Sequence, residues 1–411
     1  MYRQNDALRY ARLITGAQGI NIQKGQTLVI RCAVENAAFA AMVSEAAFQA
    51  GAGDVVIFYG DQRADRVRYQ YAARDTLTDV KMWYYDALVG YLKEGACYLN
   101  IGSADPEAFA ELDAEKVGAA MNAQTRAAAV FYDYVDRNEN QWLAVGAAGE
   151  GWAKKLFPAE TPQRAQECLW DSIYHVMRLD EPDAEAAWER HCASLAARCA
   201  RLNAGKFTGL EIKSGLGTDL RIGLAGGAVW LGGRDTTETG VSFNANMPTE
   251  EVFTAPHCMR AEGTVVASMP LHYNGTLIEG LALTFRDGAV TEYSAASGEK
   301  ALHALLSVDA GCRRLGEVAL VSYSSPIRET GMLFYSTLFD ENASCHLALG
   351  SAYPTCVQGG PALSSEEKQK RGLNQSASHV DFMFGTADLS VTGVRADGSR
   401  AAIFRDGEWS L

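Results

Sequence analysis

Histidines and carboxylates are concentrated between Leu338 and Phe382, where the chain reads LFDENASCHLALGSAYP and, further on, NQSASHVDF. Only seven histidines occur among the 411 residues, and two of them, His346 and His379, lie in this segment. Two acidic segments precede it, PTEEVFTAP around Glu251 and LGEVALV around Glu317. Imidazole and carboxylate groups are the ligands that catalytic pairs of divalent metals use. The combination favours a hydrolytic metalloenzyme.

His379 and Asp381 are two residues apart in HVDFMF, which reads as a strand. Side chains at that spacing leave the same face of a strand, so Val380 and Phe382 are expected to face the core. The H-x-D spacing alone is a weak signal, because many strands contain it by chance. Glu317 opens a second expected strand, GEVALVSY, and taken alone it is most simply a solvated strand end.

The remaining acidic residues have simpler interpretations beside the catalytic one. His346 is expected to end a helical or turn segment, and Asp340 and Glu341 before it are most simply caps of an ASCHLAL helix. Glu250 and Glu251 are adjacent, so on an extended chain at most one of them is expected to point inward. Together the segments supply two histidines and at least three carboxylates. That set suits two divalent ions about 3.5–4 Å apart that share a hydroxide.

Bulk composition limits the other possibilities. A chain of 411 residues exceeds one ordinary core, so two domains are expected. A net charge of −13 argues against nucleic acid, which requires concentrated Lys and Arg. The nine cysteines are odd in number and form no CxxC, so we expect no disulfide framework and a reducing compartment. MYRQNDALRYARLI has no apolar signal region and no apolar run approaches about 20 residues, so the cytoplasm and no membrane contact are expected.

The first half of the chain alternates between expected strands and helices, which indicates a largely parallel sheet covered on both faces. Within it, GAGD is part of a glycine-rich nucleotide loop, but nothing completes a GxGxxG, so a helix-to-strand turn is the simpler interpretation. The expected strands are Gln26 to Arg31, Gly51 to Asp61, Ala96 to Ile101 and Trp142 to Gly146, and the expected helices are Asn36 to Ala50, Thr76 to Leu92 and Pro106 to Val130.

The hydrophobic periodicity of the sequence changes near residues 200 to 206. Residues 160 to 204 are helical in pattern and contain His175 and His191, each of which is most simply a packing or surface residue. After Gly205, period-two alternation with D-G and N-G turns indicates antiparallel strands, interrupted by short helices such as Gly298 to Ala310 and by a polar loop at 359 to 372. We therefore expect an α/β N-terminal domain, residues 1–204, with a mostly parallel sheet. A C-terminal α+β domain rich in antiparallel strands, residues 205–411, follows it.

The chain resembles the aminopeptidase T and aminopeptidase S family of cocatalytic metallopeptidases over nearly its full length. The resemblance rests on NANMPTEEVFTAP, EGTV, DGAV, LGEVALV, LFDENASCHLALGSAYP, NQSASHVDF and DGEW. It does not make Asp340 or Glu341 a ligand, and it places Tyr353, in GSAYP, beside the metals. The metal ligands that the resemblance implies are Glu251, Glu317, His346, His379 and Asp381.

The resemblance implies a metallo-aminopeptidase that removes the N-terminal residue from short peptides by a hydroxide bridging two divalent ions. Glu317 would bridge the ions, Glu251 would shuttle a proton and Tyr353 would donate to the tetrahedral oxyanion. A mixed nitrogen and oxygen ligand set does not distinguish zinc, cobalt, manganese and magnesium. The resemblance also implies a homodimer whose active sites face an internal cavity, with the N-terminal domain as cover and interface.

Two other functions remain open, and a third, nucleotide binding, fails because the chain lacks a phosphate loop. A dinuclear hydrolase of phosphoesters or amidohydrolase substrates usually carries more histidines in H-x-H or D-x-H pairs, and no H-x-H occurs here. A catalytically silent relative that binds peptides would be expected to lack ligands, whereas all five are present. A nucleotide-binding protein rests on GAGD alone. His257 and His272 have no carboxylate at a matching spacing, and Cys345 is most simply a small buried residue.

Overall fold

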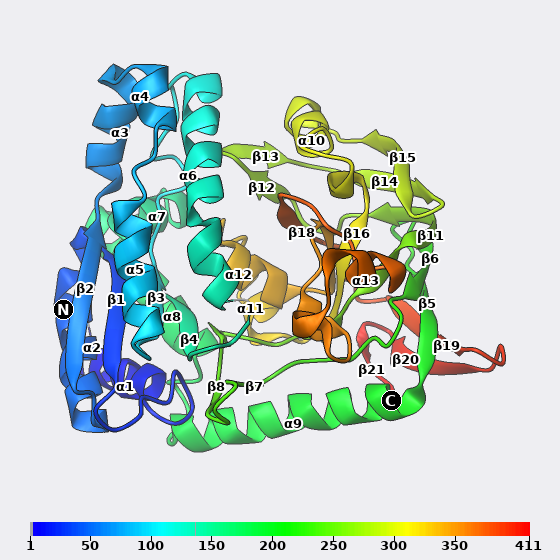
Figure 1. The fold of residues 1–411 in the computed structure, drawn as a ribbon, viewed down its shortest axis with the longest axis horizontal. Helices are drawn as coiled ribbons and strands as arrows, with labels where there is room; N and C mark the ends of the chain where they lie inside the picture. Colours follow the sequence, from blue (N-terminus) through cyan, green and yellow to red (C-terminus); the bar gives the residue numbers. More distant parts are fainter. Residues whose placement is uncertain (1–2, 136) are drawn as a thin grey trace. The chain divides into compact units, whose positions relative to one another are not determined.

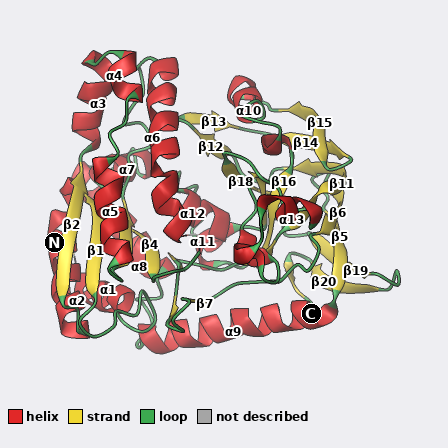
Figure 2. Cartoon of the chain, viewed as in Figure 1, coloured by secondary structure: helices red, strands yellow, loops and turns green. Residues whose placement is uncertain are grey.

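The computed structural model describes residues 3–135 and 137–411 and forms two compact units (Figures 1 and 2). One unit comprises Met1–Arg190 and Arg234–Pro248, and the other comprises His191–Gly233 and Thr249–Leu411. Each unit has its own main sheet. Within the described residues, no helix combines the length and the apolar character needed to cross a membrane.

A five-stranded parallel sheet forms the centre of the first unit, in the order β2-β1-β3-β4-β9. Its inner strands are nearly continuous apolar runs, as expected for parallel strands covered on both faces. The strands are β1 (Thr27–Ala33), β2 (Asp54–Gly60), β3 (Cys97–Gly102), β4 (Trp142–Gly146) and β9 (Asn246–Met247); a separate hairpin joins β7 (Asp235–Thr236) to β8 (Ser242–Phe243).

The helices of the first unit pack on the sheet through aromatic and aliphatic side chains. One face, bearing Val29 and Tyr98, shares a core with α5 and α6. Tyr10 of α1 stacks on Phe39 of α2, and Trp170 of α8 meets the same ring edge-on. The helices are α1 (Gln4–Thr15), α2 (Ala37–Ala50), α3 (Gln62–Tyr71), α4 (Arg74–Thr78), α5 (Trp83–Lys93), α6 (Ala114–Val135), α7 (Glu150–Leu156) and α8 (Pro162–Val176), with the 3-10 turn η1 (Val34–Asn36). The helix α9 (Ala184–Gly205) begins in this unit and belongs to the second unit from His191 onward.

The second unit contains an eight-stranded antiparallel sheet and a four-stranded antiparallel sheet that share one apolar core. The larger sheet has the order β15-β14-β11-β6-β5-β19-β20-β21, and the smaller has the order β10-β16-β17-β18. The strands are β5 (Phe207–Lys213), β6 (Asp219–Leu224), β10 (Val252–Thr254), β11 (Pro256–Val266), β12 (Leu271–Tyr273), β13 (Thr276–Ile278), β14 (Ala282–Arg286), β15 (Ala289–Ser294), β16 (Leu315–Leu320), β17 (His346–Gly350), β18 (His379–Met383), β19 (Ser390–Arg395), β20 (Arg400–Arg405) and β21 (Glu408–Trp409).

The predicted fold class is confirmed, because a parallel sheet with helices is joined to antiparallel sheets in the C-terminal half. Helices in the second unit are short. They are α10 (Glu299–Leu305), α11 (Pro326–Glu329), α12 (Thr337–Asp340) and α13 (Ser365–Lys370), with the 3-10 turns η2 (Gly311–Arg313), η3 (Glu341–Ala343), η4 (Pro354–Cys356) and η5 (Gly360–Ala362).

Two local predictions in this unit are wrong. The polar segment at 359–372 was expected to be a loop, but it contains α13, which begins with a capping box. Ser364 accepts a hydrogen bond from the Glu367 amide, and the Glu367 side chain accepts one from the Ser364 amide. The segment ASCHLAL was expected to be a helix, but from His346 onward it is strand β17. Both neighbours of that strand are paired to it, and this pairing outweighs the helical propensity of Ala and Leu.

Candidate metal centre

The four-stranded sheet β10-β16-β17-β18 brings the predicted site residues onto one face. Glu317 of β16 is paired with Ala348 of β17, which is paired in turn with Asp381 of β18. Paired residues of an antiparallel sheet point to the same side, and so do residues two apart on one strand. His346, two residues from Ala348, and His379, two residues from Asp381, therefore share this face.

The opposite face of the same sheet is apolar and secures it to the core. Val318, Leu347 and Phe382 form a row across the three strands, and all three are fully buried. Val380 packs against the same cluster, as predicted from its position between His379 and Asp381. This strict alternation fixes the register, because a slip by one residue would turn the polar groups into the core.

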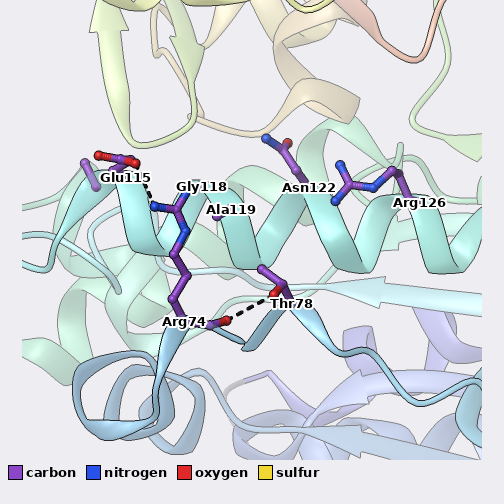
Figure 3. A pocket seen from close by; sticks show the side chains of 8 residues that line it. Arg74, Thr78, Glu115, Gly118, Ala119, Asn122 and Arg126 are labelled. Atoms are coloured by element: carbon purple, nitrogen blue, oxygen red, sulfur yellow. Dashed lines mark hydrogen bonds and ion pairs between the residues drawn. The ribbon is translucent and has the colours of Figure 1, made fainter. Parts of the chain in front are cut away.

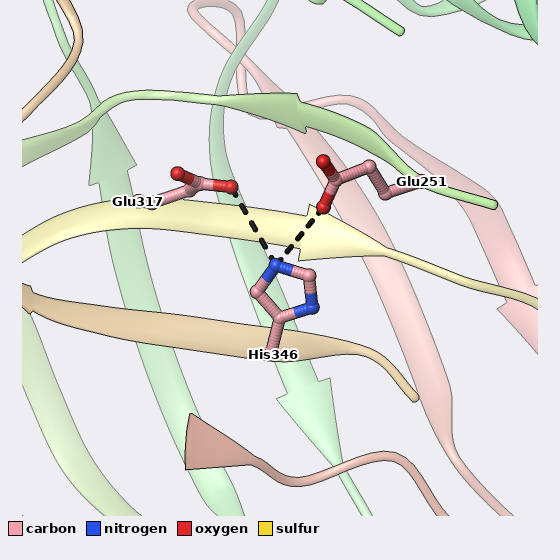
Figure 4. Close-up of side chains that lie close together, drawn as sticks. All are labelled: Glu251, Glu317 and His346. Carbon is pink, nitrogen blue, oxygen red and sulfur yellow. Dashed lines mark ion pairs between the residues drawn. The ribbon is translucent and has the colours of Figure 1, made fainter. Parts of the chain in front are cut away.

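Glu251 completes the group from the residue before β10, and Figure 4 shows its carboxylate and that of Glu317 converging on the His346 ring. Nε2 of His346 lies 3.0 Å from Oε2 of Glu251 and 3.6 Å from Oε1 of Glu317. On the other side, Nε2 of His379 lies 3.4 Å from Oε2 of Glu317 and 3.4 Å from Oδ1 of Asp381. The residues thus form two triads, and Glu317 gives one carboxylate oxygen to each.

Both imidazole rings are held so that Nε2 faces the carboxylates. Nδ1 of His346 lies 3.1 Å from the Ser344 carbonyl oxygen, and Nδ1 of His379 lies 2.7 Å from that of Ser351. A carbonyl oxygen only accepts, so Nδ1 carries the proton in each ring, and in the neutral ring the Nε2 lone pair points into the group. A backbone acceptor of this kind is the usual outer partner of a metal-binding histidine.

The residues present fit a cation at each triad. Glu251 and Asp381 are buried, yet neither Oε2 of Glu251 nor Oδ1 of Asp381 receives a hydrogen bond from any described residue. Each of these oxygens instead faces a histidine Nε2, so two acceptors oppose each other unless a proton or a metal ion lies between them. Two imidazoles and three carboxylates form the mixed nitrogen and oxygen donor set that divalent transition metals accept.

Without metal, this cluster holds protons that a metal ion must displace. Burial acts to lower the pKa of His379, but the Asp381 and Glu317 carboxylates raise it to about 10. Burial likewise opposes protonation of His346, and Glu251 and Glu317 raise its pKa well above the usual value. The carboxylates therefore favour the protonated form of both rings in the metal-free protein, and a ring protonated on both nitrogens does not bind a metal.

Metal affinity is expected to increase with pH between about 6 and 9. This pH window lies below the pKa of His379, so a metal ion must displace a proton in order to bind. For each displaced proton, the apparent metal affinity increases about tenfold per pH unit. Titration calorimetry with Zn²⁺ in buffers of different ionisation enthalpy counts the protons released. An affinity that is flat over this window, with no proton release, would contradict the arrangement.

Small residues leave the space that the site needs. Ala348 lies between Glu317 and Asp381 on the site face, and Gly350 lies opposite His379. A β-bulge between Leu315 and Glu317 shifts the register just before Glu317. In this bulge a Cβ atom on Gly316 would lie 2.4 Å from the Gly350 carbonyl oxygen. Glycine at position 316 thus permits the bulge that directs Glu317 onto the site face.

Replacing Gly350 with Ala is expected to lower the free energy of unfolding by about 2–4 kcal/mol. Gly350 has a φ of +114°, and a Cβ atom there would lie 2.0 Å from the Ser378 carbonyl oxygen. Urea denaturation measures the loss. Gly275→Ala is the matched control, because Gly275 also has a positive φ, +79°, but no atom lies within 4 Å of its added Cβ. Equal losses in both variants would show that backbone strain, rather than the contact with Ser378, is responsible.

Tyr353 lies at the rim of the group. Its ring centroid is 4.8 Å from that of His379 and 6.2 Å from that of Phe253, and 38% of the residue's surface is exposed. His379 is also the most exposed of the five predicted ligands, with 20% of its side chain accessible. Access to the site from within this unit is therefore on the side of Tyr353 and His379.

Two expectations about this segment are corrected. His346 begins strand β17 instead of ending a helical segment. Glu250 and Glu251 are both buried, although at most one was expected to point inward, because each finds its own histidine. Glu251 faces His346, and the Glu250 carboxylate lies 3.5 Å from Nε2 of His191. His191 is thus a packing residue, as the sequence suggested, and its ring nitrogen also contacts the Thr249 carbonyl.

The neighbouring acids Asp340 and Glu341 have different roles. Asp340 accepts hydrogen bonds from the amides of Phe334 and Ser336, so it stabilises a turn, and burial raises its pKa to about 7. Glu341 is half-buried close to the two triads, and desolvation followed by the negative charge of Asp381 raises its pKa well above the usual value. Sequence reasoning set Glu341 aside as a cap, and no spacing rule could place it here, because the turn η3 orients it.

Two further residues can be placed. His272 lines a small cavity that Glu341 and Asp381 also line, although no sequence spacing pairs them. Cys345 is buried, its thiol donates to the Val321 carbonyl, and burial raises its pKa to about 12. A thiol that stays protonated is a poor nucleophile, which agrees with the simpler interpretation of Cys345.

A buried cluster of imidazoles and carboxylates, with ligand atoms close enough to hold ions, defines a metal-binding protein. A family model described as thermophilic metalloprotease (M29) matches residues 3–409. The chain belongs to this family. It is 42% identical over 391 residues to a protein named aminopeptidase T from Thermus thermophilus, covering 95% of both chains. It is 39% identical over 403 residues to one named aminopeptidase 2 from Geobacillus stearothermophilus, covering 98% of this chain and 97% of the relative.

The fold agrees with these relationships. A solved structure described as wild-type AmpT from Thermus thermophilus superposes with a TM-score of 0.93 at 39% identity, covering 99% of this chain and all of that one. The expected enzyme class, a metallo-aminopeptidase, is confirmed by the family and by the names of the relatives.

Proposed function

We propose that this chain removes the N-terminal residue from short peptides by using two divalent metal ions that share Glu317. The observation that carries the proposal is the division of the Glu317 carboxylate between two triads, Oε1 toward His346 and Oε2 toward His379. A carboxylate that serves two ion sites at once is the device that holds paired catalytic metals about 3.5–4 Å apart. The five proposed ligands are Glu251, Glu317, His346, His379 and Asp381.

When bound, two such ions polarise a scissile carbonyl and supply a bridging hydroxide at neutral pH. The residues of the chain orient the reaction. Hydrolysis forms one C–O bond and breaks the C–N bond, so a proton must pass from the attacking water to the leaving amine. Glu251, whose Oε2 has no hydrogen-bond donor among the described residues, is proposed to carry that proton.

Tyr353 is proposed to stabilise the tetrahedral oxyanion. Its ring lies beside His379 at the exposed rim of the group, so its hydroxyl is accessible to a substrate carbonyl. A preorganised donor at that position contributes about 3–4 kcal/mol to transition-state stabilisation. The phenol donates one proton in a hydrogen bond and does not need to ionise.

Several broader features are also proposed. The metals are zinc, cobalt, manganese or magnesium, and the protein acts in the cytoplasm as a homodimer on peptides with a free N-terminus. The catalytic domain is proposed to be residues 205–411, and residues 1–204 to serve as cover and interface. Analytical ultracentrifugation tests the dimer, and a monomer at micromolar concentration would contradict it.

The experiment that tests the function compares unblocked with N-acetylated dipeptides containing Leu, Met or Arg. Metal-stripped protein is assayed before and after the addition of Zn²⁺, Co²⁺ or Mn²⁺, and bound metal is counted in parallel. We expect activity only with metal and only with a free amine. No activity with two ions bound would indicate a dinuclear hydrolase of another substrate class, and no activity without bound metal would indicate a silent relative.

A further inference from the structure

A second cavity, of about 440 Å³, lies in the first unit at the carboxyl ends of β1, β2 and β3. Helices α5 and α6 cover it on the sheet face that bears Val29 and Tyr98. In the strand order β2-β1-β3, the strand after β1 lies on one side of it and β3 lies on its other side, so the order of the strands reverses at β1. In open parallel sheets, ligands bind outside the carboxyl ends of the strands where the order reverses. The volume also suits a small molecule.

Aromatic rings form the wall of this cavity. Tyr98 of β3 packs edge-on against Phe131 of α6 with ring centroids 4.8 Å apart, and Tyr84 meets Tyr85 at 5.2 Å. Tyr98 and Phe131 are both buried, whereas Tyr132 keeps 45% of its surface. Rings packed against one another keep their positions, so the wall is preformed. It offers flat apolar surface with hydroxyl groups at its edge.

One guanidinium interrupts the aromatic wall. Arg31 of β1 projects from the same sheet face as Val29, and its paired neighbours are Phe58 on β2 and Asn100 on β3. Asn100 and Arg31 both line the cavity. Among the described residues, no carboxylate oxygen lies within 4 Å of an Arg31 side-chain nitrogen, whereas many other arginines of the chain form ion pairs.

The tyrosines around Arg31 do not neutralise it. Burial raises the pKa of Tyr98 and of Tyr85, so both phenols are uncharged at neutral pH, and the Tyr98 hydroxyl forms a hydrogen bond with the Arg31 guanidinium. Asp65 also lines the cavity, and the Arg31 charge acts to lower its pKa, although no ion pair within 4 Å joins the two among the described residues. Arg31 is exposed, so its guanidinium can be reached by a ligand in the cavity, and its planar fork matches a carboxylate.

Another cavity of the first unit, shown in Figure 3, provides a contrast to the cavity at Arg31. It lies between α4 and α6 and contains Arg74, Asn122 and Arg126. Arg74 already forms an ion pair with Glu115 at 2.7 Å, and none of the described residues that line the cavity is aromatic. The cavity at Arg31 thus differs in having an aromatic wall and a guanidinium that forms no ion pair within 4 Å among the described residues.

We propose that the cavity at the carboxyl ends of β1 and β3 binds a small aromatic monocarboxylate. The carboxylate pairs with Arg31 and accepts a hydrogen bond from the Asn100 amide, and the ring of the ligand packs among Tyr84, Tyr98 and Tyr132. Free aromatic amino acids belong to this class. The proposal is independent of the metal centre and of the proposed peptidase reaction.

Titration calorimetry on the full-length, metal-stripped protein tests the proposal, because removing the metals prevents the carboxylate from binding to them. The probes are phenylacetate and L-phenylalanine, with phenethylamine as the cationic counterpart. We expect saturable binding of the two carboxylates and none of the amine. Arg31→Gln is expected to weaken binding at least about tenfold, because a charge-assisted pair is lost.

Arg74→Gln is the matched control, because it removes an arginine from the other cavity of the same unit. Its affinity for phenylacetate and L-phenylalanine should stay within about twofold of that of the parent protein. Arg31→Lys keeps the positive charge but loses the planar guanidinium, so its affinity for the carboxylates is expected to lie between those of the parent and of Arg31→Gln. If Arg31→Gln fails to fold, Arg31→Lys is used in its place. Binding that is absent at millimolar concentration, equal for phenethylamine, or unchanged in both Arg31 variants overturns the proposal.

Discussion

Glu317→Gln is expected to lose both metal ions and at least about a thousandfold in kcat/KM. The substitution keeps the shape of the side chain but removes the charge that each triad shares through Oε1 and Oε2. Paired metals contribute several kcal/mol of transition-state stabilisation, and each 1.4 kcal/mol corresponds to a factor of ten in rate. Metal content by atomic emission, together with dipeptide hydrolysis, measures both effects on one sample.

The fold of this variant should survive. Burial raises the pKa of Glu317, which means that its ionised form is disfavoured in the metal-free protein. Replacing it with a neutral amide removes that cost but also removes the carboxylate that faces both histidine rings, so metal-free Glu317→Gln is expected to melt close to the metal-free parent. Glu292→Gln, on exposed β15, is the control for a lost glutamate. Full activity with two ions bound per chain would exclude Glu317 as the shared ligand.

Ala348→Leu is expected to abolish metal binding although every proposed ligand is retained. Ala348 is paired with Glu317 on one side and with Asp381 on the other, so a larger side chain at this position projects between the two triads. A displacement of about 1 Å at reacting groups can cost about a hundredfold in rate, and an isobutyl group in this space displaces more than one ligand. Metal content and kcat/KM are again the measurements.

Ala348→Gly serves as the matched control for this variant. It changes the same position without filling the site, so it should retain both ions and most of the activity, with a modest loss of strand stability. Circular dichroism of both variants establishes that the sheet is present. If Ala348→Leu binds two ions as tightly as the parent, the metals do not lie above Ala348 and the proposed geometry is wrong.

Part of this centre follows from the sequence by simple rules. HVDF alternates polar with apolar residues, and the structure has strand β18 with His379 and Asp381 on one face and Phe382 in the core. The parallel sheet likewise follows from the alternation of apolar strand segments with helical segments in the first half of the chain. Periodicity succeeds here because each of these strands has one dominant apolar face or is buried on both.

Other parts depend on pairing between distant segments, which no local rule contains. ASCHLAL has helical composition, yet it forms β17 because β16 and β18 bond to both of its edges. Glu250 and Glu251 are both buried because each meets a histidine from another element. The helix α13 is different, because a local signal for it is present in the sequence. Ser364 and Glu367 have the spacing of a capping box, and the prediction of a loop at 359–372 did not take this signal into account.

The division of the centre among four separate segments also bears on how the protein resists unfolding. The proposed ligands occupy positions 251, 317, 346, 379 and 381, so the native sheet must close long chain loops before both ions can bind. Ions bound there act as cross-links between β10, β16, β17 and β18, because their binding free energy adds to the stability of the folded state alone. Chelation is therefore expected to shorten the lifetime of the second unit on heating, and saturating metal to lengthen it. Metal bound at these positions is thus expected to stabilise the folded chain as well as to take part in the proposed reaction.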